Sequence, residues 1–199
     1  MTLQFETLPE EWLRRREGLG VWEGKGKVAA VGVGVAPTSR RWDWDPQTSV
    51  GANAVIALRK AMDDAGVTPD QVDGLVVVPE TTTGRFDWPP AWPEGRDIPA
   101  EMAELFTPTD DPRDGMARLS VEWVLKNMPE LTNVKFTAHV PTDTAPALIG
   151  AIEAINHGQT QVCLVLKGWH NLSGRYYVGQ GAARGDTIAT REKWSTGWG

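Results

Sequence analysis

Residues 134–168 read VKFTAHVPTDTAPALIGAIEAINHGQTQVCLVLKG, and this stretch decides the fold. Apolar runs at 134–138 and 161–166 have the length of buried strands, and the apolar segment between them, 145–157, has the length of a helix. Gly158 follows as the residue that most easily adopts the left-handed backbone conformation at a helix end. The stretch therefore predicts a strand, a tight turn, a helix and a second strand.

The turn at 139–144 carries Thr142, Asp143 and Thr144, and it contains neither cysteine nor serine. One interpretation is an N-cap, because Thr and Asp side chains accept the free N–H groups of a helix's first turn. The other is chemical: Asp143 acts as a base, or the helix N-terminus receives an oxyanion or a thioester carbonyl. Both can hold at once, so these three residues are candidate catalytic residues.

The rest of the chain adds further elements in a regular order. The apolar runs 27–35 (KVAAVGVGV) and 74–78 (GLVVV) are predicted to be strands buried on both faces. Helical spacing of apolar residues predicts helices at 49–65, with Gly66 as its C-cap, and at 115–127. The order is β-α-β-loop-α-β-α-β, which predicts an α/β fold with βαβ units and a mostly parallel sheet.

The predicted domain organisation is simple. We expect residues 1–26 to be an N-terminal extension and residues 27–199 to form one α/β domain, which is long enough for a sizeable core. Residues 79–114 form a long insertion rich in proline and tryptophan. An irregular segment of this length has a function or covers something, or it is a Pro-rich surface flap.

Composition excludes several classes of protein. The net charge of −6 gives no reason to expect a nucleic-acid or anionic-membrane partner. No apolar run approaches the roughly 20 residues that span a bilayer, and the acidic N-terminus has no signal-peptide pattern. The single cysteine, Cys163, excludes a disulfide framework and fits a reducing compartment, so we expect a cytoplasmic protein.

Other motifs do not lead to a cofactor or a metal. Gly32 and Gly34 resemble the start of a dinucleotide-binding fingerprint, but no third glycine opens a helix, so the glycines are expected to permit close packing. The histidines His139, His157 and His170 are dispersed, so no metal site is expected. His139 sits where a strand enters the key turn, and it is either a structural or a catalytic residue. Cys163 lies mid-strand, where burial makes a thiol inert.

The C-terminal segment is rich in arginine and aromatic residues. Trp169, Arg175 and Tyr176 are candidate substrate-binding residues, since aromatic and arginine side chains line ligand clefts. The alternative is that these side chains seal loops or a subunit interface.

Three stretches of the chain together resemble the thiolase superfamily: KVAAVGVGV, ALRKAMDDAGVTPDQVDGLVVV and APALIGAIEAINHGQTQVCLVLKG. The resemblance is to the branch of sterol-carrier-protein-type thiolases and lipid-transfer-protein aldolases, and it covers residues 27–199. It implies that the chain is the N-terminal half of a layered fold built from two similar halves. It also implies an oligomer that acts on acyl-CoA by Claisen or retro-aldol chemistry. Coenzyme A would then be part of the substrate, with no covalently bound cofactor.

The chain departs from that family in two ways. The family's nucleophilic cysteine would fall at about Ala145, and the family's second half would follow Gly199. One reading is an enzyme subunit for carbon–carbon bond cleavage or formation in lipid or steroid degradation without the cysteine. The others are a non-catalytic structural subunit of an acyl-CoA-processing complex, or a truncated product. The resemblance also implies a zinc-ribbon/OB-type acyl-CoA-binding partner.

Overall fold

The computed structural model of the 199-residue chain describes residues 26–38, 42–79, 93–116, 118–140 and 144–168. The chain divides into two units, Met1–Ala30 and Val31–Gly199. The described residues of the first unit, 26–30, contain a turn at Gly26 and Lys27 and no helix or strand. The helices and strands described below all belong to the second unit.

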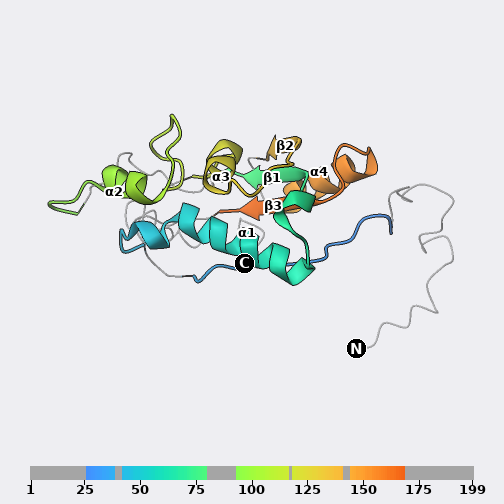
Figure 1. Ribbon diagram of the computed structural model, residues 1–199, viewed down its shortest axis with the longest axis horizontal. Coiled ribbons are helices and arrows are strands. Elements are labelled where there is room, and N and C mark those ends of the chain that lie inside the picture. The colour runs from blue at the N-terminus through green and yellow to red at the C-terminus, as the bar shows by residue number, and fades with distance from the viewer. Residues whose placement is uncertain (1–25, 39–41, 80–92, 117, 141–143, 169–199) are drawn as a thin grey trace, which may run out of the picture. The chain divides into compact units, whose positions relative to one another are not determined.

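A parallel sheet of three strands organises the second unit. β1 (Gly74–Val78) lies between β2 (Phe136–His139) and β3 (Cys163–Lys167), and Gly74 is aligned with Phe136 on one side and Cys163 on the other (Figure 1). This confirms the predicted α/β fold with a parallel sheet. The predicted strand at 74–78 has its observed bounds, and the other two begin two residues later than predicted.

Helices cover both faces of this sheet. Alternate β1 residues point in opposite directions, as the pleat requires. Leu75 and Val77 join the core that contains residues of α1 (Val50–Ala65) and α3 (Val121–Asn127). Val76 and Val78 instead pack with Ala147 and Ala151 of α4 (Thr144–Asn156). Because both faces are covered, all five β1 residues are buried and apolar or glycine.

The ends of α1 are set by local sequence. The Ser49 hydroxyl accepts a hydrogen bond from the Ala52 N–H at 3.1 Å, and Gly66 ends the helix with a φ of 65°. The predicted helix at 49–65 and its glycine C-cap are therefore confirmed to within one residue. In the described residues, no helix is both long enough and apolar enough to cross a membrane.

The strand predicted at 27–35 is wrong, because the described residues 26–38 contain no strand. Residues 31–35 lie along α1, and Gly32 and Gly34 approach the backbone of Ala57 and Ala61 so closely that a Cβ would clash. The Val33 N–H donates a hydrogen bond to the Asp64 carboxylate at 2.9 Å. In a sheet, this N–H would instead pair with a neighbouring strand. The two glycines permit close packing, as expected, but against a helix.

The insertion contains a helix that the sequence pattern did not predict. α2 (Ile98–Leu105) starts at Asp97, whose carboxylate accepts from the Ala100 N–H at 3.3 Å, and Pro99 occupies its first turn. The helix predicted at 115–127 begins later, at Val121. Gly115 has a φ of 81°, which a helix cannot contain.

Two short 3-10 helices, Pro46–Thr48 and Pro69–Gln71, complete the described elements. The second leads into Asp73, which joins the amino ends of the three strands. Its carboxylate accepts from the Thr160 hydroxyl at 2.5 Å and from the Gln161 and Val162 N–H groups at 2.9 Å each, just before β3. Its backbone oxygen accepts from the Phe136 N–H at 3.0 Å, at the start of β2. Burial raises the pKa of Asp73, but these donors outweigh burial and leave the pKa lowered.

Replacing Asp73→Asn keeps the side chain's shape and removes its charge. We expect the free energy of unfolding at neutral pH to fall by about 1–3 kcal/mol, because hydrogen bonds to a charged acceptor are lost. A carboxyl whose folded pKa is lowered stabilises the fold above its unfolded pKa of about 3.9, and this contribution disappears as the pH falls through the folded pKa.

Urea denaturation from about pH 7 to about pH 3 measures this effect. The wild-type and Asp73→Asn proteins should differ by a constant amount above about pH 5 and converge below about pH 4. Asp70→Asn, at an exposed position nearby, is the matched control and should behave as wild type. A difference that stays constant down to the lowest pH would contradict the role assigned to the charge.

Candidate functional site

Two of the candidate catalytic residues, His139 and Thr144, lie at the carboxyl edge of the sheet, where β2 ends and α4 begins. His139 is the last residue of β2 and Thr144 is the first of α4. Thr142 and Asp143 lie outside the described residues, as do the candidate substrate-binding residues. Those three are Trp169, Arg175 and Tyr176.

The N-terminus of α4 is the chemically relevant part of this edge. Thr144 is half-buried and Ala145 is exposed. The first N–H groups of a helix have no intrahelical partner, and they carry the positive end of the helix dipole. Such a terminus can stabilise negative charge that develops on a carbonyl oxygen.

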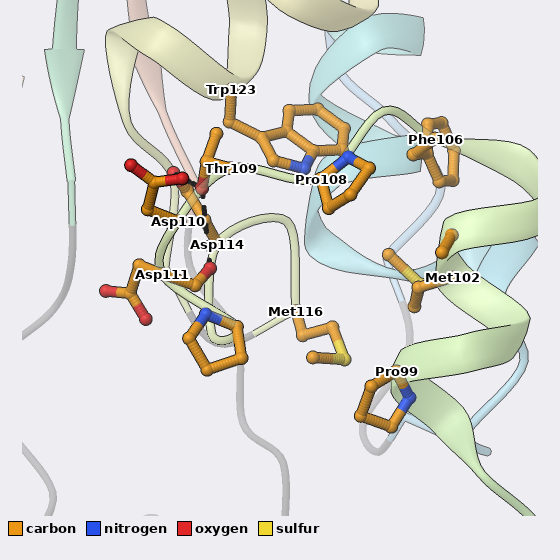
Figure 2. Close-up of a pocket in the computed structure, with 12 residues that line it drawn as sticks. Pro99, Met102, Phe106, Pro108, Thr109, Asp110, Asp111, Asp114, Met116 and Trp123 are labelled. Atoms are coloured by element: carbon orange, nitrogen blue, oxygen red, sulfur yellow. Dashed lines mark hydrogen bonds between the residues drawn. The ribbon is translucent and has the colours of Figure 1, made fainter.

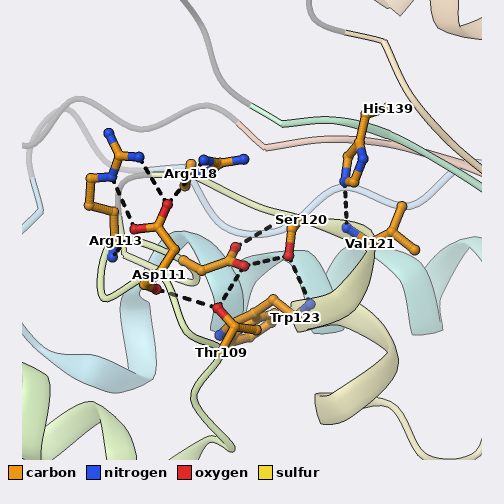
Figure 3. Close-up of polar contacts among 9 residues, drawn as sticks. Thr109, Asp111, Arg113, Arg118, Ser120, Val121, Trp123 and His139 are labelled. Carbon is orange, nitrogen blue, oxygen red and sulfur yellow. Dashed lines mark hydrogen bonds and ion pairs between the residues drawn. The ribbon is translucent and has the colours of Figure 1, made fainter.

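His139 has a structural contact at this edge. Its Nε2 accepts a hydrogen bond from the Val121 N–H at 2.9 Å, so this nitrogen carries no proton in the contact (Figure 3). Val121 is the first residue of α3, and its N–H is one of those that a helix leaves unsatisfied. Two roles were left open for His139, and this hydrogen bond supports the structural one.

A short segment, residues 118–121, contacts the carboxyl ends of all three strands. The Leu119 N–H donates to the Pro79 oxygen at 2.8 Å, directly after β1. The Leu119 side chain lies so close to Gly168, directly after β3, that a Cβ there would clash. Together with the His139 contact at the end of β2, these contacts place the segment across this edge of the sheet.

A buried hydrogen-bond network fixes this segment. Asp114 and Ser120 are 8% and 9% exposed. The Asp114 carboxylate accepts from the Ser120 N–H at 2.8 Å, from the Thr109 hydroxyl at 2.9 Å and from the Ser120 hydroxyl. The Ser120 oxygen in turn accepts from the Trp123 N–H at 2.9 Å and caps α3. The network joins the insertion to the layer of helices.

Next to this network, Asp111 lies between two arginines (Figure 3). Arg113 contacts it through Nε at 3.1 Å and through a terminal nitrogen at 2.9 Å, and Arg118 through a terminal nitrogen at 3.0 Å. The hydrogen bond from Arg113 is the largest of the effects that lower the pKa of Asp111 to about 2. Asp111 is therefore ionised at neutral pH, and the cluster carries one excess positive charge.

Sequence patterns placed Thr109, Asp111, Arg113 and Asp114 in an irregular insertion, and Arg118 and Ser120 in the helix predicted at 115–127, and identified none of them as part of a site. One local signal was present: Ser120 followed by Glu122 is typical of a helix start, because serine caps the first turn and an acid favours the helix dipole. The partners of Ser120 carry no such signal, since Asp114 and Thr109 are ordinary loop residues by composition.

The surroundings of Cys163 agree with the inert thiol expected from the sequence. Cys163 is half-buried, and burial, assisted by the charge of Asp73, raises the pKa of its thiol to about 11, which makes it inert. His157 is exposed, and its Nδ1 lies 4.0 Å from the Glu153 carboxylate one helical turn earlier. The described part of the chain contains no group of three or more His, Cys, Asp or Glu placed to hold a metal ion.

Comparisons with known proteins add one distant similarity. No protein-family model matches the chain, and no curated protein matches it. Among solved structures it is similar to one named "Ltp2-ChsH2(DUF35) aldolase", with a TM-score of 0.42 and 21% sequence identity. The match covers 68% of this chain and 25% of that one, so the chain spans about a quarter of its length.

The structural role of His139 can be tested by two substitutions. His139→Ala leaves the Val121 N–H without its acceptor and should lower the free energy of unfolding by about 0.5–1.5 kcal/mol. His139→Gln supplies a side-chain oxygen that can accept the same bond and should recover most of the loss. Urea denaturation measures both values. Equal losses in the two variants, or no loss in either, would contradict the capping role.

Proposed function

We propose that the chain is a thiolase-like subunit of an enzyme that cleaves or forms a carbon–carbon bond beside a CoA thioester, without a cysteine nucleophile. The sequence resemblance motivates this function. One structural observation carries it: the N-terminus of α4 lies at the carboxyl edge of a parallel sheet, with exposed Ala145 where the family has its cysteine. A terminus in this position can hold a thioester oxygen.

In the retro-aldol direction, the reaction needs a base and an oxyanion-stabilising group. In the proposed mechanism Asp143 removes the proton from the β-hydroxyl group of the substrate. The bond between Cα and Cβ then breaks, the β-carbon leaves as a carbonyl compound, and the electron pair moves into a thioester enolate. The N–H groups of Thr144 and Ala145 at the start of α4 stabilise the enolate oxygen, with the hydroxyls of Thr142 and Thr144 as further donors. Protonation at Cα completes the reaction.

The proposal includes substrate contacts and partners. Trp169, Arg175 and Tyr176 are proposed to contact the acyl-CoA, and CoA remains part of the substrate. The resemblance implies an oligomer, and residues of another chain in a homo- or hetero-oligomer are proposed to complete the site. A zinc-ribbon/OB-type acyl-CoA-binding protein is the proposed partner, and the cytoplasm the proposed compartment.

A second candidate function is a non-catalytic structural subunit of an acyl-CoA-processing complex. It is favoured by apolar side chains on α4 close to Thr144: Leu148 is 43% exposed and Ile149 is 60% exposed. Exposed apolar patches mark surfaces that bind other proteins. In this role the α4 terminus would pack against a partner whose own residues carry out the reaction.

Cleavage of β-hydroxyacyl-CoA thioesters, short and steroid-type, distinguishes the two candidates. The full chain is assayed alone and with the zinc-ribbon/OB-type partner co-expressed, and the released carbonyl product is measured. Asp143→Asn should lower kcat by about 100-fold or more, because the base is removed while its shape is kept. Asp70→Asn, a remote exposed acid, is the matched control and should leave kcat unchanged.

The two candidate functions give opposite results in this assay. Activity that depends on the chain and falls with Asp143→Asn supports the enzyme subunit. Activity that depends on the presence of the chain but is indifferent to Asp143 would support the structural subunit and contradict the proposed mechanism.

A further inference from the structure

A pocket of about 170 Å³ lies beside α2, in the insertion (Figure 2). We call it the insertion pocket. It is lined by residues of α2, by the segment 108–116 and by Trp123 of α3. A cavity of roughly 150 Å³ is enough to hold one benzene ring, so the insertion pocket has room for a small organic molecule.

One side of the insertion pocket is apolar. Met102 and Phe106 of α2 face it, together with Met116 and Trp123. The rings of Phe106 and Trp123 have their centroids 5.3 Å apart. Aromatic rings offer their faces to apolar groups and to cations, and methionine side chains adapt to the shape of what they contact.

The other side of the insertion pocket carries three acids, which together with Arg113 and Arg118 have a formal net charge of −1. Figure 2 shows Asp110, Asp111 and Asp114 on the side opposite Phe106 and Met102. Asp111 is paired with its two arginines, and the Asp114 carboxylate is occupied by the Thr109 and Ser120 donors.

Asp110 differs from the other two acids. It is exposed, and within the described residues its carboxylate makes no hydrogen bond or ion pair. Asp110 lines the same pocket as the rings of Phe106 and Trp123, and an exposed carboxylate there favours a positively charged ligand over a neutral or negative one of the same size.

We propose that the insertion pocket binds a small organic cation: an apolar body about the size of one ring, with an ammonium group that pairs with Asp110. The ring lies against Met102 and Phe106, with the buried Trp123 behind them. This site is separate from the proposed thioester site and does not depend on it. The insertion then has a binding function of its own.

Three probes of equal size and different charge test the proposal on the full chain. Benzylamine, benzyl alcohol and benzoate are each titrated while the Trp123 indole N–H and the methionine methyl signals are followed by NMR. Benzylamine should bind with a Kd of about 1 mM, as expected for a ligand of its size. Benzyl alcohol should bind about tenfold more weakly, and benzoate more weakly still.

Two variants locate the site. Asp110→Asn should weaken benzylamine binding by about three- to fivefold and leave benzyl alcohol unchanged. Ala103→Phe, at an exposed α2 position that lines the pocket, should fill the space and abolish binding of both. Asp70→Asn, remote from the pocket, should change neither.

Several results would overturn the proposal. No change in the Trp123 and methionine signals at about 10 mM benzylamine would show that the pocket does not bind this class of ligand. Benzoate binding as tightly as benzylamine would contradict the assigned charge. Equal binding by wild type and Ala103→Phe would place the ligand elsewhere on the protein.

Discussion

The carboxylate of Asp73 is the constraint on which the rest of the structure depends. The carboxylate accepts hydrogen bonds from the residues just before β3, and the backbone oxygen of Asp73 accepts one from the start of β2. Asp73 itself directly precedes β1. The three strands therefore begin in register, with Gly74 aligned to Phe136 and Cys163. Gly74 has room only for a hydrogen, because a Cβ there would meet the Thr160 hydroxyl. Strands that start together and have similar lengths also end together, so one polar cluster at the amino edge determines where the carboxyl edge lies.

The carboxyl edge is organised by a second buried acid. The Asp114 carboxylate accepts hydrogen bonds from Ser120, Ser120 caps α3, and the neighbouring residues Leu119 and Val121 contact the ends of the strands. In this arrangement Asp114, at the end of the insertion, is buried, and the N-terminus of α4 lies at the same edge of the sheet. The proposed function depends on that terminus, because a helix start can stabilise an enolate or a thioester oxygen without any cysteine. The insertion pocket lies beside α2, with Asp110 on one side of it and the α2 side chains on the other.

Local patterns in the sequence were sufficient for the elements whose signals are local. The apolar run of β1, the Ser49 and Gly66 ends of α1 and the strand–turn–helix–strand of residues 134–168 were predicted within a few residues. The run at 27–35 shows the limit of such patterns: small apolar residues suit both a buried strand and a segment pressed against a helix, and Asp64 decides between them. The contacts of His139 with α3 and of Asp114 with Ser120 were not predictable, since they join segments whose proximity only the fold creates.

The most direct test of the account is to place a thiol at the position that the resemblance to thiolases gives to the nucleophilic cysteine, by the substitution Ala145→Cys. A cysteine at a helix N-terminus has a lowered thiol pKa, whereas native Cys163, with a pKa of about 11, stays unreactive. At about pH 7 the new cysteine should react with iodoacetamide roughly three- to tenfold faster than Gln159→Cys, an exposed control at the opposite end of α4. It should also exchange with acetyl-CoA: its thiolate attacks the thioester carbonyl, CoA leaves as its thiolate, and mass spectrometry detects the acetyl group on the protein. Equal reactivity of the two cysteines, with no acetyl transfer to either, would contradict the claim that the α4 terminus is a site for thioesters.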